Sequence, residues 1–162
     1  MKLSNTLLQA LVAQFNMELG SAYLYRSMAH DMKRLALHGY ASWLEKQYEE
    51  EKGHAFKILA YVEDRDGVVD FLPIEGVKNH YDAPLDAAKD SLAHEEKVSA
   101  SLRKLFLQAR EEGDLETELF LQSFVSEQVE EEANARNNVE GFTKAANCQG
   151  LLYMFDAYLA KR

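Results

Sequence analysis

The sequence has few of the residues that interrupt helices or cross-link a chain: one cysteine, two prolines and eight glycines among 162 residues. The single cysteine, Cys148, excludes an intramolecular disulfide framework and a four-cysteine metal site, so a cytoplasmic location is expected. No apolar run is long enough for a transmembrane helix. Scarce glycine and proline in a chain that is 47% hydrophobic favour long helices around a buried core.

The N-terminal segment and the charge balance argue against two further classes. Gln9, Gln14 and Glu18 interrupt the apolar residues near the N-terminus, which indicates a helix of the mature protein rather than a signal peptide. The chain has 18 basic and 27 acidic residues, and its net charge is −9. Because a nucleic-acid backbone must be met by clustered Lys and Arg, we expect no nucleic-acid partner. An acidic surface instead favours cations.

Apolar residues recur at three- and four-residue spacing through most of the chain, which is the pattern of amphipathic helices. The expected helices cover residues 8–32, 44–62, 85–109, 121–142 and 151–159. We expect the first helix to end near Gly39 and the second to stop at Arg65-Asp66-Gly67. The sequence EEGD at 111–114 should separate the third helix from the fourth.

Residues 66–84 hold both prolines and show neither helical nor strand periodicity, so we predict one long loop there. Its roughly 18 residues can span about 60 Å, which exceeds the length of a helix of about 28 residues, so the loop can run the full length of a bundle. Short connections elsewhere make antiparallel neighbours. The predicted fold is all-α: a single domain over 1–162, forming a four-helix bundle of up-down-down-up order with a short C-terminal fifth helix.

Each of the four long helices has a row of apolar residues along one face, its apolar seam, and a carboxylate interrupts that seam. Glu18 and Glu51 each lie seven residues after a seam leucine, and Glu95 and Glu131 hold seam positions of the third and fourth helices. An ionised carboxylate in an apolar core costs more than a domain's net stability unless it is neutralised, paired or bound to metal. A single glutamate could lie at the edge of the seam, with its carboxylate reaching water. Four together favour a metal site.

Glu51 and His54 support the same interpretation. They are three residues apart, about 60° around the helix axis, so the carboxylate and the ring can meet one ion. A Glu-x-x-His pair is common by chance and by itself is more often a surface ion pair, so its weight comes from the carboxylates on the other helices. Oxygen-rich sites with one imidazole suit iron or manganese, with zinc as a competitor.

Four motifs on these helices resemble those of non-haem ferritins. They are NMELGSAYLY at 16–25, YEEEKGH at 48–54, HEE at 94–96 and VSEQVEEE at 125–132. The resemblance covers nearly the whole chain, including the long crossover and the fifth helix. It implies a ferritin-like bundle in which carboxylates and a Glu-x-x-His motif from facing helices bind two iron ions in the core.

The resemblance assigns residues to each metal position. Glu18 and His54 would bind the first iron of a ferroxidase centre, and Glu51 would bridge the two ions. Glu95 and Glu131 would hold the second iron. These assignments follow from the family pattern and not from the spacing alone.

Five other residues match the family pattern around this pair. Gln128 would lie near the second iron, and Tyr25 would lie beside the metals as a donor of a hydrogen bond or an electron. Tyr25 could equally be a core aromatic with a satisfied hydroxyl. Glu50, Glu127 and Glu130 match the ligands of a third iron site, and their simpler interpretation is a solvated acidic face.

The chain also departs from related families. Glu130 stands where bacterioferritins and many other di-iron bundles have a second histidine, which argues against a symmetric catalytic di-iron cofactor. Lys52 occupies the place of the haem-ligating methionine of bacterioferritins, so we expect no haem. With one cysteine there is no rubredoxin-like tail, which weakens a rubrerythrin interpretation.

The resemblance implies iron storage and detoxification. The expected reaction is oxidation of Fe(II) to Fe(III) by O2 or H2O2 at the two-iron centre, followed by mineral deposition in a homo-oligomeric shell of 24 subunits. Two alternatives stay open. One is a di-iron peroxide reductase or oxidase of the rubrerythrin-like class that stores no mineral, and the other is a structural bundle whose acidic residues only keep it in solution.

Overall fold

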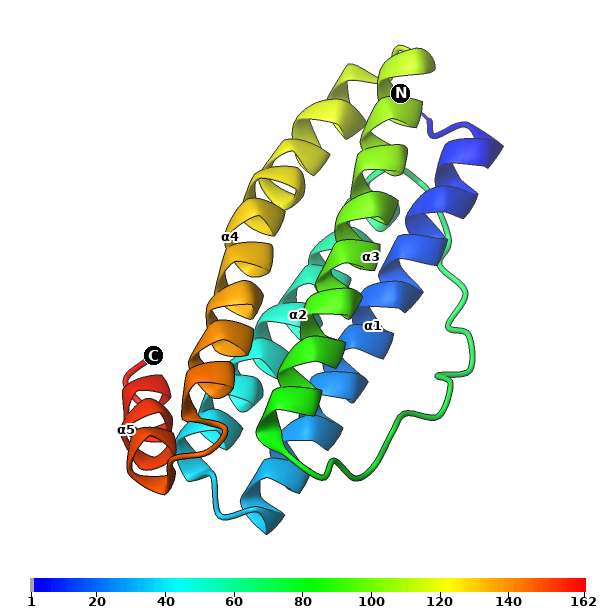
Figure 1. Cartoon of the computed structure of the whole chain (residues 1–162). Helices are drawn as coiled ribbons and strands as arrows, with labels where there is room; N and C mark the ends of the chain where they lie inside the picture. Colours follow the sequence, from blue (N-terminus) through cyan, green and yellow to red (C-terminus); the bar gives the residue numbers. More distant parts are fainter. Residues whose placement is uncertain (1) are drawn as a thin grey trace.

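The computed structural model describes residues 2–162, and within that range it contains five α-helices and no strand. The helices are α1 (Asn5–Arg34), α2 (His38–Asp64), α3 (Pro84–Glu111), α4 (Leu115–Ala145) and α5 (Gln149–Leu159). The first four form a bundle, and α5 lies at one end of it beside α2 and α4 (Figure 1). The predicted bundle, with its long crossover between α2 and α3 and its short fifth helix, is confirmed.

The turn between α1 and α2 lies earlier than the sequence predicted. α1 ends at Arg34 rather than near Gly39, because Ala36 takes a φ of 58° and breaks the helix. Gly39 lies inside α2, where a Cβ would come within 1.8 Å of the carbonyl oxygen of Asp156 on α5. The Asp156 carboxylate accepts hydrogen bonds from the Gly39 and Tyr40 backbone N–H groups. Thus α5 caps the N-terminus of α2.

The predicted crossover is a loop that runs along the outside of the bundle next to α1 (Figure 1). It begins after α2 stops, where Asp66 takes a φ of 57°. The side-chain amide of Asn16 on α1 bonds two backbone groups of the loop at 2.9 Å each. Near the other end, Asp31 accepts a hydrogen bond from the Tyr81 N–H at 2.7 Å. Hydrogen bonds therefore hold the loop against α1 near both ends of the loop.

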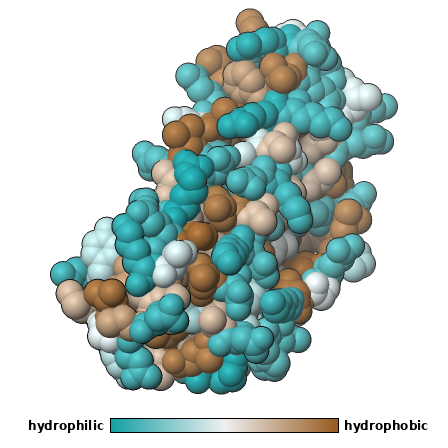
Figure 2. Space-filling view, in the orientation of Figure 1, coloured by the Kyte–Doolittle hydropathy of each residue, from teal (hydrophilic) through white to brown (hydrophobic). Residues whose placement is uncertain are grey.

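The core consists of two separate apolar clusters. One joins the C-terminal half of α1 to the N-terminal half of α2, with Tyr81 and Phe142. The other joins the N-terminal half of α1 to the C-terminal half of α2, with residues of α3 from Val98 onward and of α4 up to Phe124. Figure 2 shows a mostly hydrophilic face with separate apolar residues among the polar ones. Within residues 2–162, no helix is both long and apolar enough to span a membrane.

Candidate metal centre

The four seam carboxylates lie between the two apolar clusters, one on each long helix. Glu18, Glu51 and Glu95 are each only 1% exposed, and Glu131 is half-buried. Because the clusters on both sides pack the helices against one another, seam positions at the same height are brought together. These four glutamates thus form an acidic layer across an otherwise apolar core.

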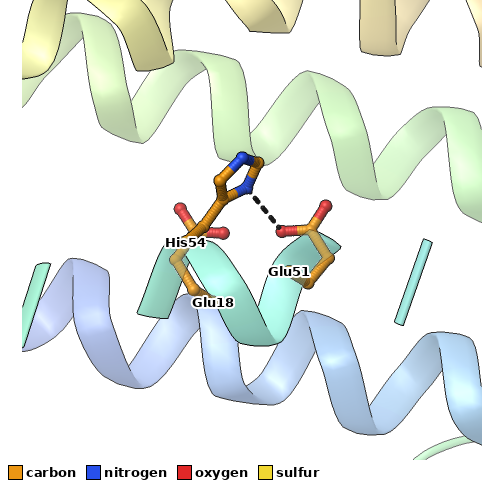
Figure 3. A group of neighbouring side chains, drawn as sticks. All are labelled: Glu18, Glu51 and His54. Atoms are coloured by element: carbon orange, nitrogen blue, oxygen red, sulfur yellow. Dashed lines mark ion pairs between the residues drawn. The ribbon is translucent and has the colours of Figure 1, made fainter. Parts of the chain in front are cut away.

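Glu18 on α1 and Glu51 and His54 on α2 converge within this layer (Figure 3). One potential ligand atom from each lies within 4.8 Å of the other two. His54 Nδ1 lies 3.5 Å from Glu51 Oε2, and Gln14 Nε2 donates a hydrogen bond to Glu18 Oε1 at 2.6 Å. Across residues 2–162, no other three His, Cys, Asp or Glu side chains are grouped so closely.

Two carboxylate oxygens of this group are suited to a cation. Glu18 Oε2 and Glu51 Oε2 are buried, and neither has a hydrogen-bond partner among the described residues. A buried charged group left unpaired costs more than the roughly 1–3 kcal/mol of an unpaired neutral one. Two carboxylates and one imidazole form a donor set that suits iron or zinc. The residues present therefore fit a divalent metal ion.

Burial shifts the carboxyl groups of the layer toward their protonated forms. The pKa of Glu18 is raised well above its ordinary value, first by burial and then by the charge of Glu51. Burial also raises the pKa of Glu51 to about 8, that of Glu131 to about 7, and that of Glu95 above its ordinary value. The charges of Glu95 and Glu131 add to the shift of Glu51. A bound cation favours the ionised forms, so metal binding here would release protons.

Glu95 is held from two sides. The Tyr25 hydroxyl on α1 donates a hydrogen bond to Glu95 Oε1, and Gln128 Nε2 on α4 donates to Glu95 Oε2 at 3.1 Å. Ser91 Oγ lies 3.1 Å from the same tyrosine hydroxyl. Burial raises the pKa of Tyr25 well above its ordinary value, and the charge of Glu95 adds to the shift. Tyr25 therefore stays protonated and acts as a hydrogen-bond donor to the carboxylate.

Glu131 is fixed by a residue that the sequence motifs did not single out. Gln47 Nε2 on α2 donates a hydrogen bond to Glu131 Oε2 at 2.5 Å. Gln14 and Gln47 both lie on the buried seam, each four residues before a seam glutamate. A polar residue one turn before a buried carboxylate is the signal that could have identified Gln14, which bonds Glu18. The partner of Gln47 lies on another helix, so this spacing does not indicate its bond.

The three residues predicted for a third iron site lie on the outside of the layer. Glu50, Glu127 and Glu130 are all exposed. Glu127 Oε2 lies 3.0 Å from His54 Nε2, and Glu50 pairs with Arg162. The three carboxylates form no close ligand group in the part of the chain that is described, and their assignment stays a prediction.

His94, the first residue of the HEE motif, would be taken from its sequence position as a surface histidine, but it is half-buried. Its Nε2 lies 2.7 Å from Ser21 Oγ on α1, and its ring meets the Tyr25 ring edge-on with centroids 6.1 Å apart. Burial lowers the pKa of His94 to about 4, so its ring is neutral near pH 7. His94 thus supports α1 beside Tyr25 and is not a free surface residue.

Comparison with known proteins places this geometry in a family. The family described as Ferritin-like domain matches residues 8–145. The chain is 33% identical over 160 residues to a bacterial non-heme ferritin of Staphylococcus aureus, covering 99% of this chain and 96% of the relative. It is 34% identical over 160 residues to a bacterial non-heme ferritin of Bacteroides fragilis, covering 99% of both.

Solved structures agree with the sequence relatives. An open pore ferritin from the hyperthermophilic archaeon Archaeoglobus fulgidus matches with a TM-score of 0.97 at 36% identity, over 99% of both chains. A structure described as a humanized archaeal ferritin gives a TM-score of 0.97 at 35% identity, over 99% of this chain and 98% of that one. The match includes α5 and the crossover, so the predicted resemblance is confirmed. This chain belongs to the ferritin-like family.

Proposed function

We propose that this protein stores and detoxifies iron, and that it is a ferroxidase whose substrate is Fe(II). In this proposal Glu18 and His54 bind the first ferrous ion, and Glu51 is shared between two ions. Glu95 and Glu131 bind the second. Gln128 and Tyr25 hold Glu95 in place by hydrogen bonds.

One observation carries the proposal: Glu18, Glu51 and His54 converge within 4.8 Å inside a ferritin-like bundle, and two of their buried oxygens accept no hydrogen bond. Buried carboxylates without counter-charges lower the stability of a fold, so a bundle that places several of them in one layer needs a reason to keep them. The relatives are ferritins that match over 99% of this chain, which supports iron as the metal.

The chemistry requires two ferrous ions close together. Each Fe(II) gives one electron, and two electrons with two protons convert O2 to H2O2, or H2O2 to two water molecules. The chain's own part is to offset the repulsion between the cations with carboxylate charge and to hold the ligands in position. The protons that leave Glu18 and Glu51 when metal binds are released close to where the oxidant needs them.

Storage requires a compartment for the Fe(III) product. We propose that copies of this chain assemble into a hollow shell of 24 subunits in which Fe(III) is deposited as mineral. The match to ferritins over 99% of the chain, with α5 included, supports this assembly. The third iron site and the cytoplasmic location stay predictions from the sequence.

Replacing Glu51 tests the proposal. In Glu51→Ala, rapid oxidation of Fe(II) by O2, followed by absorbance of the ferric product, should slow by about tenfold or more, because the shared ligand is lost. Glu49→Ala is the matched control, since Glu49 lies on the same helix but is exposed and paired with Lys52. That control should oxidise iron at the wild-type rate.

Size-exclusion chromatography of the same samples separates the alternatives. Both variants should elute as the same large shell as the wild-type protein. Oxidation in Glu51→Ala at the wild-type rate would contradict the proposed centre. A dimer that reduces peroxide and retains no iron mineral would favour the rubrerythrin-like alternative.

A further inference from the structure

Arg162, which follows α5, reaches back to the edge of the acidic layer. Its Nη1 donates a hydrogen bond to Gln47 Oε1, and its Nη2 donates to Glu50 Oε2, both at 2.6 Å. Nη1 also lies 3.4 Å from the carbonyl oxygen of Trp43, and the guanidinium carbon lies 4.5 Å from the centre of the Trp43 ring. Residues 43, 47 and 50 lie on one face of α2, so a single guanidinium contacts all three.

The contact with Gln47 extends to a proposed iron ligand. A guanidinium group only donates hydrogen bonds, so the oxygen of the Gln47 amide must face Arg162. The amide nitrogen then faces Glu131 and donates to its Oε2. Because Gln47 is only 1% exposed, water cannot easily replace either bond. Arg162 therefore contacts Glu50 directly and orients Glu131 through Gln47.

We propose that Arg162 is a positioning residue of the metal centre: an internal cation that pairs with Glu50 and is displaced when a metal ion binds on the outer side of the layer. This inference rests on the proposed function, and it adds to the proposed centre an outer metal position at which Glu50 is a ligand. Glu50 Oε2 cannot accept the guanidinium hydrogen bond and bind a cation from the same side. A metal ion beside Glu50 would also repel the guanidinium group.

The structure gives Arg162 room to leave. Its side chain borders an open cavity of about 370 Å³ that is also lined by Trp43 and Asn134. The exchange links metal binding to the position of the segment after α5. The outer position is the metal position beside Glu50. The contacts of Arg162 with Glu50 lower the affinity of this position for metal, and by reciprocity a metal ion bound there weakens these contacts by the same factor.

Trp43 provides a direct readout, since it is the only tryptophan in the chain and is 6% exposed. The assembled protein, freed of metal with a chelator, is titrated with Zn²⁺, which has no redox chemistry of its own. Calorimetry counts the bound ions while Trp43 emission is recorded. We expect the inner ions to bind without a spectral change. As the outer position fills, the emission should shift to longer wavelength, because water replaces the guanidinium over the ring.

Three variants separate exchange from a merely structural role. Arg162→Ala should bind the outer Zn²⁺ about two- to fivefold more tightly, the range of a partly exposed ion pair, and its emission should be shifted before metal is added. Arg162→Lys keeps the charge but lacks the two separate donor nitrogens that reach Gln47 and Glu50, so it should bind the outer Zn²⁺ with intermediate affinity. Glu50→Gln should bind the inner ions and show no spectral change.

The outcomes distinguish the two proposals. If the wild-type protein binds Zn²⁺ but Trp43 emission does not move, or if Arg162→Ala binds the outer ion with unchanged affinity, the exchange is wrong and the ferroxidase centre stands. If the wild-type protein binds no Zn²⁺ in the acidic layer, the proposed centre fails and the exchange fails with it.

Discussion

The acidic layer and the apolar clusters on either side of it are built on the same four helices but follow opposite rules. In the clusters, side chains such as Leu11 and Ile58 are fully buried among other apolar groups. In the layer, Glu18 and Glu51 are as deeply buried, yet each has a carboxylate oxygen that accepts no hydrogen bond. The clusters stabilise the bundle by burial, whereas buried carboxylates without counter-charges lower its stability. The difference separates the residues that keep the fold from those that we propose bind metal.

The apolar clusters should show the largest effect on stability. Leu11→Ala removes a fully buried side chain and leaves a cavity, so the free energy of unfolding should fall by about 2–5 kcal/mol. Leu107→Ala, at a leucine that is 52% exposed, is the matched control and should change it by less than about 0.5 kcal/mol. Denaturant titration measures both. Equal losses in the two variants would contradict the division between cluster and surface.

Metal binding should have the next largest effect on the free energy of unfolding. Zn²⁺ at about 100 times its dissociation constant should raise the free energy of unfolding by about 2.7 kcal/mol. The gain should shrink strongly in Glu18→Gln, which keeps the size of the side chain but removes one anionic ligand. Thermal unfolding with and without Zn²⁺ measures the shift. The same shift in both proteins would place the metal elsewhere.

The pH dependence of the metal-free protein should reveal the carboxyl groups of the layer. The pKa of Glu51 is about 8 in the folded protein against an ordinary 4.5, so above pH 4.5 the folded state holds a proton that the unfolded state has released. Stability should therefore be greatest at low pH within this window and fall as the pH rises toward 8. The raised pKa of Glu131, about 7, acts in the same direction.

Glu51→Gln isolates the contribution of Glu51. The variant has no proton to lose, so at pH 8 its free energy of unfolding should exceed that of the wild-type protein by about 1–3 kcal/mol, and at pH 5 the two should be similar. Glu49→Gln, on the exposed side of the same helix, should follow the wild-type curve. A wild-type protein that becomes more stable between pH 5 and pH 8 would show that the layer is not strained by burial.

The sequence predicted those features that repeat along a helix. Apolar residues at three- and four-residue spacing located the four long helices, and seven-residue steps placed Glu18 and Glu51 in the core, where the structure has them. Contacts between distant elements have no periodic signature, and these were missed. Examples are the capping of α2 by Asp156, the bond of His94 to Ser21 and the pairing of Arg162 with Glu50.

The candidate site divides in the same way. The spacing of Glu51 and His54 on one helix, together with the seam carboxylates of the other helices, predicted that both reach one point. The hydrogen bond from Gln47 to Glu131 joins two helices whose relative height depends on packing, so no pattern within either helix predicts it. The roles assigned to these residues by resemblance stay predictions until metal is bound.

Tyr25 joins the layer to the neighbouring cluster and should give the smallest effect. Tyr25→Phe keeps the ring in the cluster but removes the hydroxyl that donates to Glu95, so metal-free protein should lose about 0.5–1.5 kcal/mol of stability. Gln128 still donates to the other Glu95 oxygen. With Zn²⁺ bound, the freed Glu95 oxygen gains a cation as its partner, so the loss should shrink. Thermal unfolding of both proteins, with and without Zn²⁺, measures this coupling. If the loss is equal under both conditions, the hydrogen bond from Tyr25 is not coupled to metal binding, and Glu95 is not a ligand.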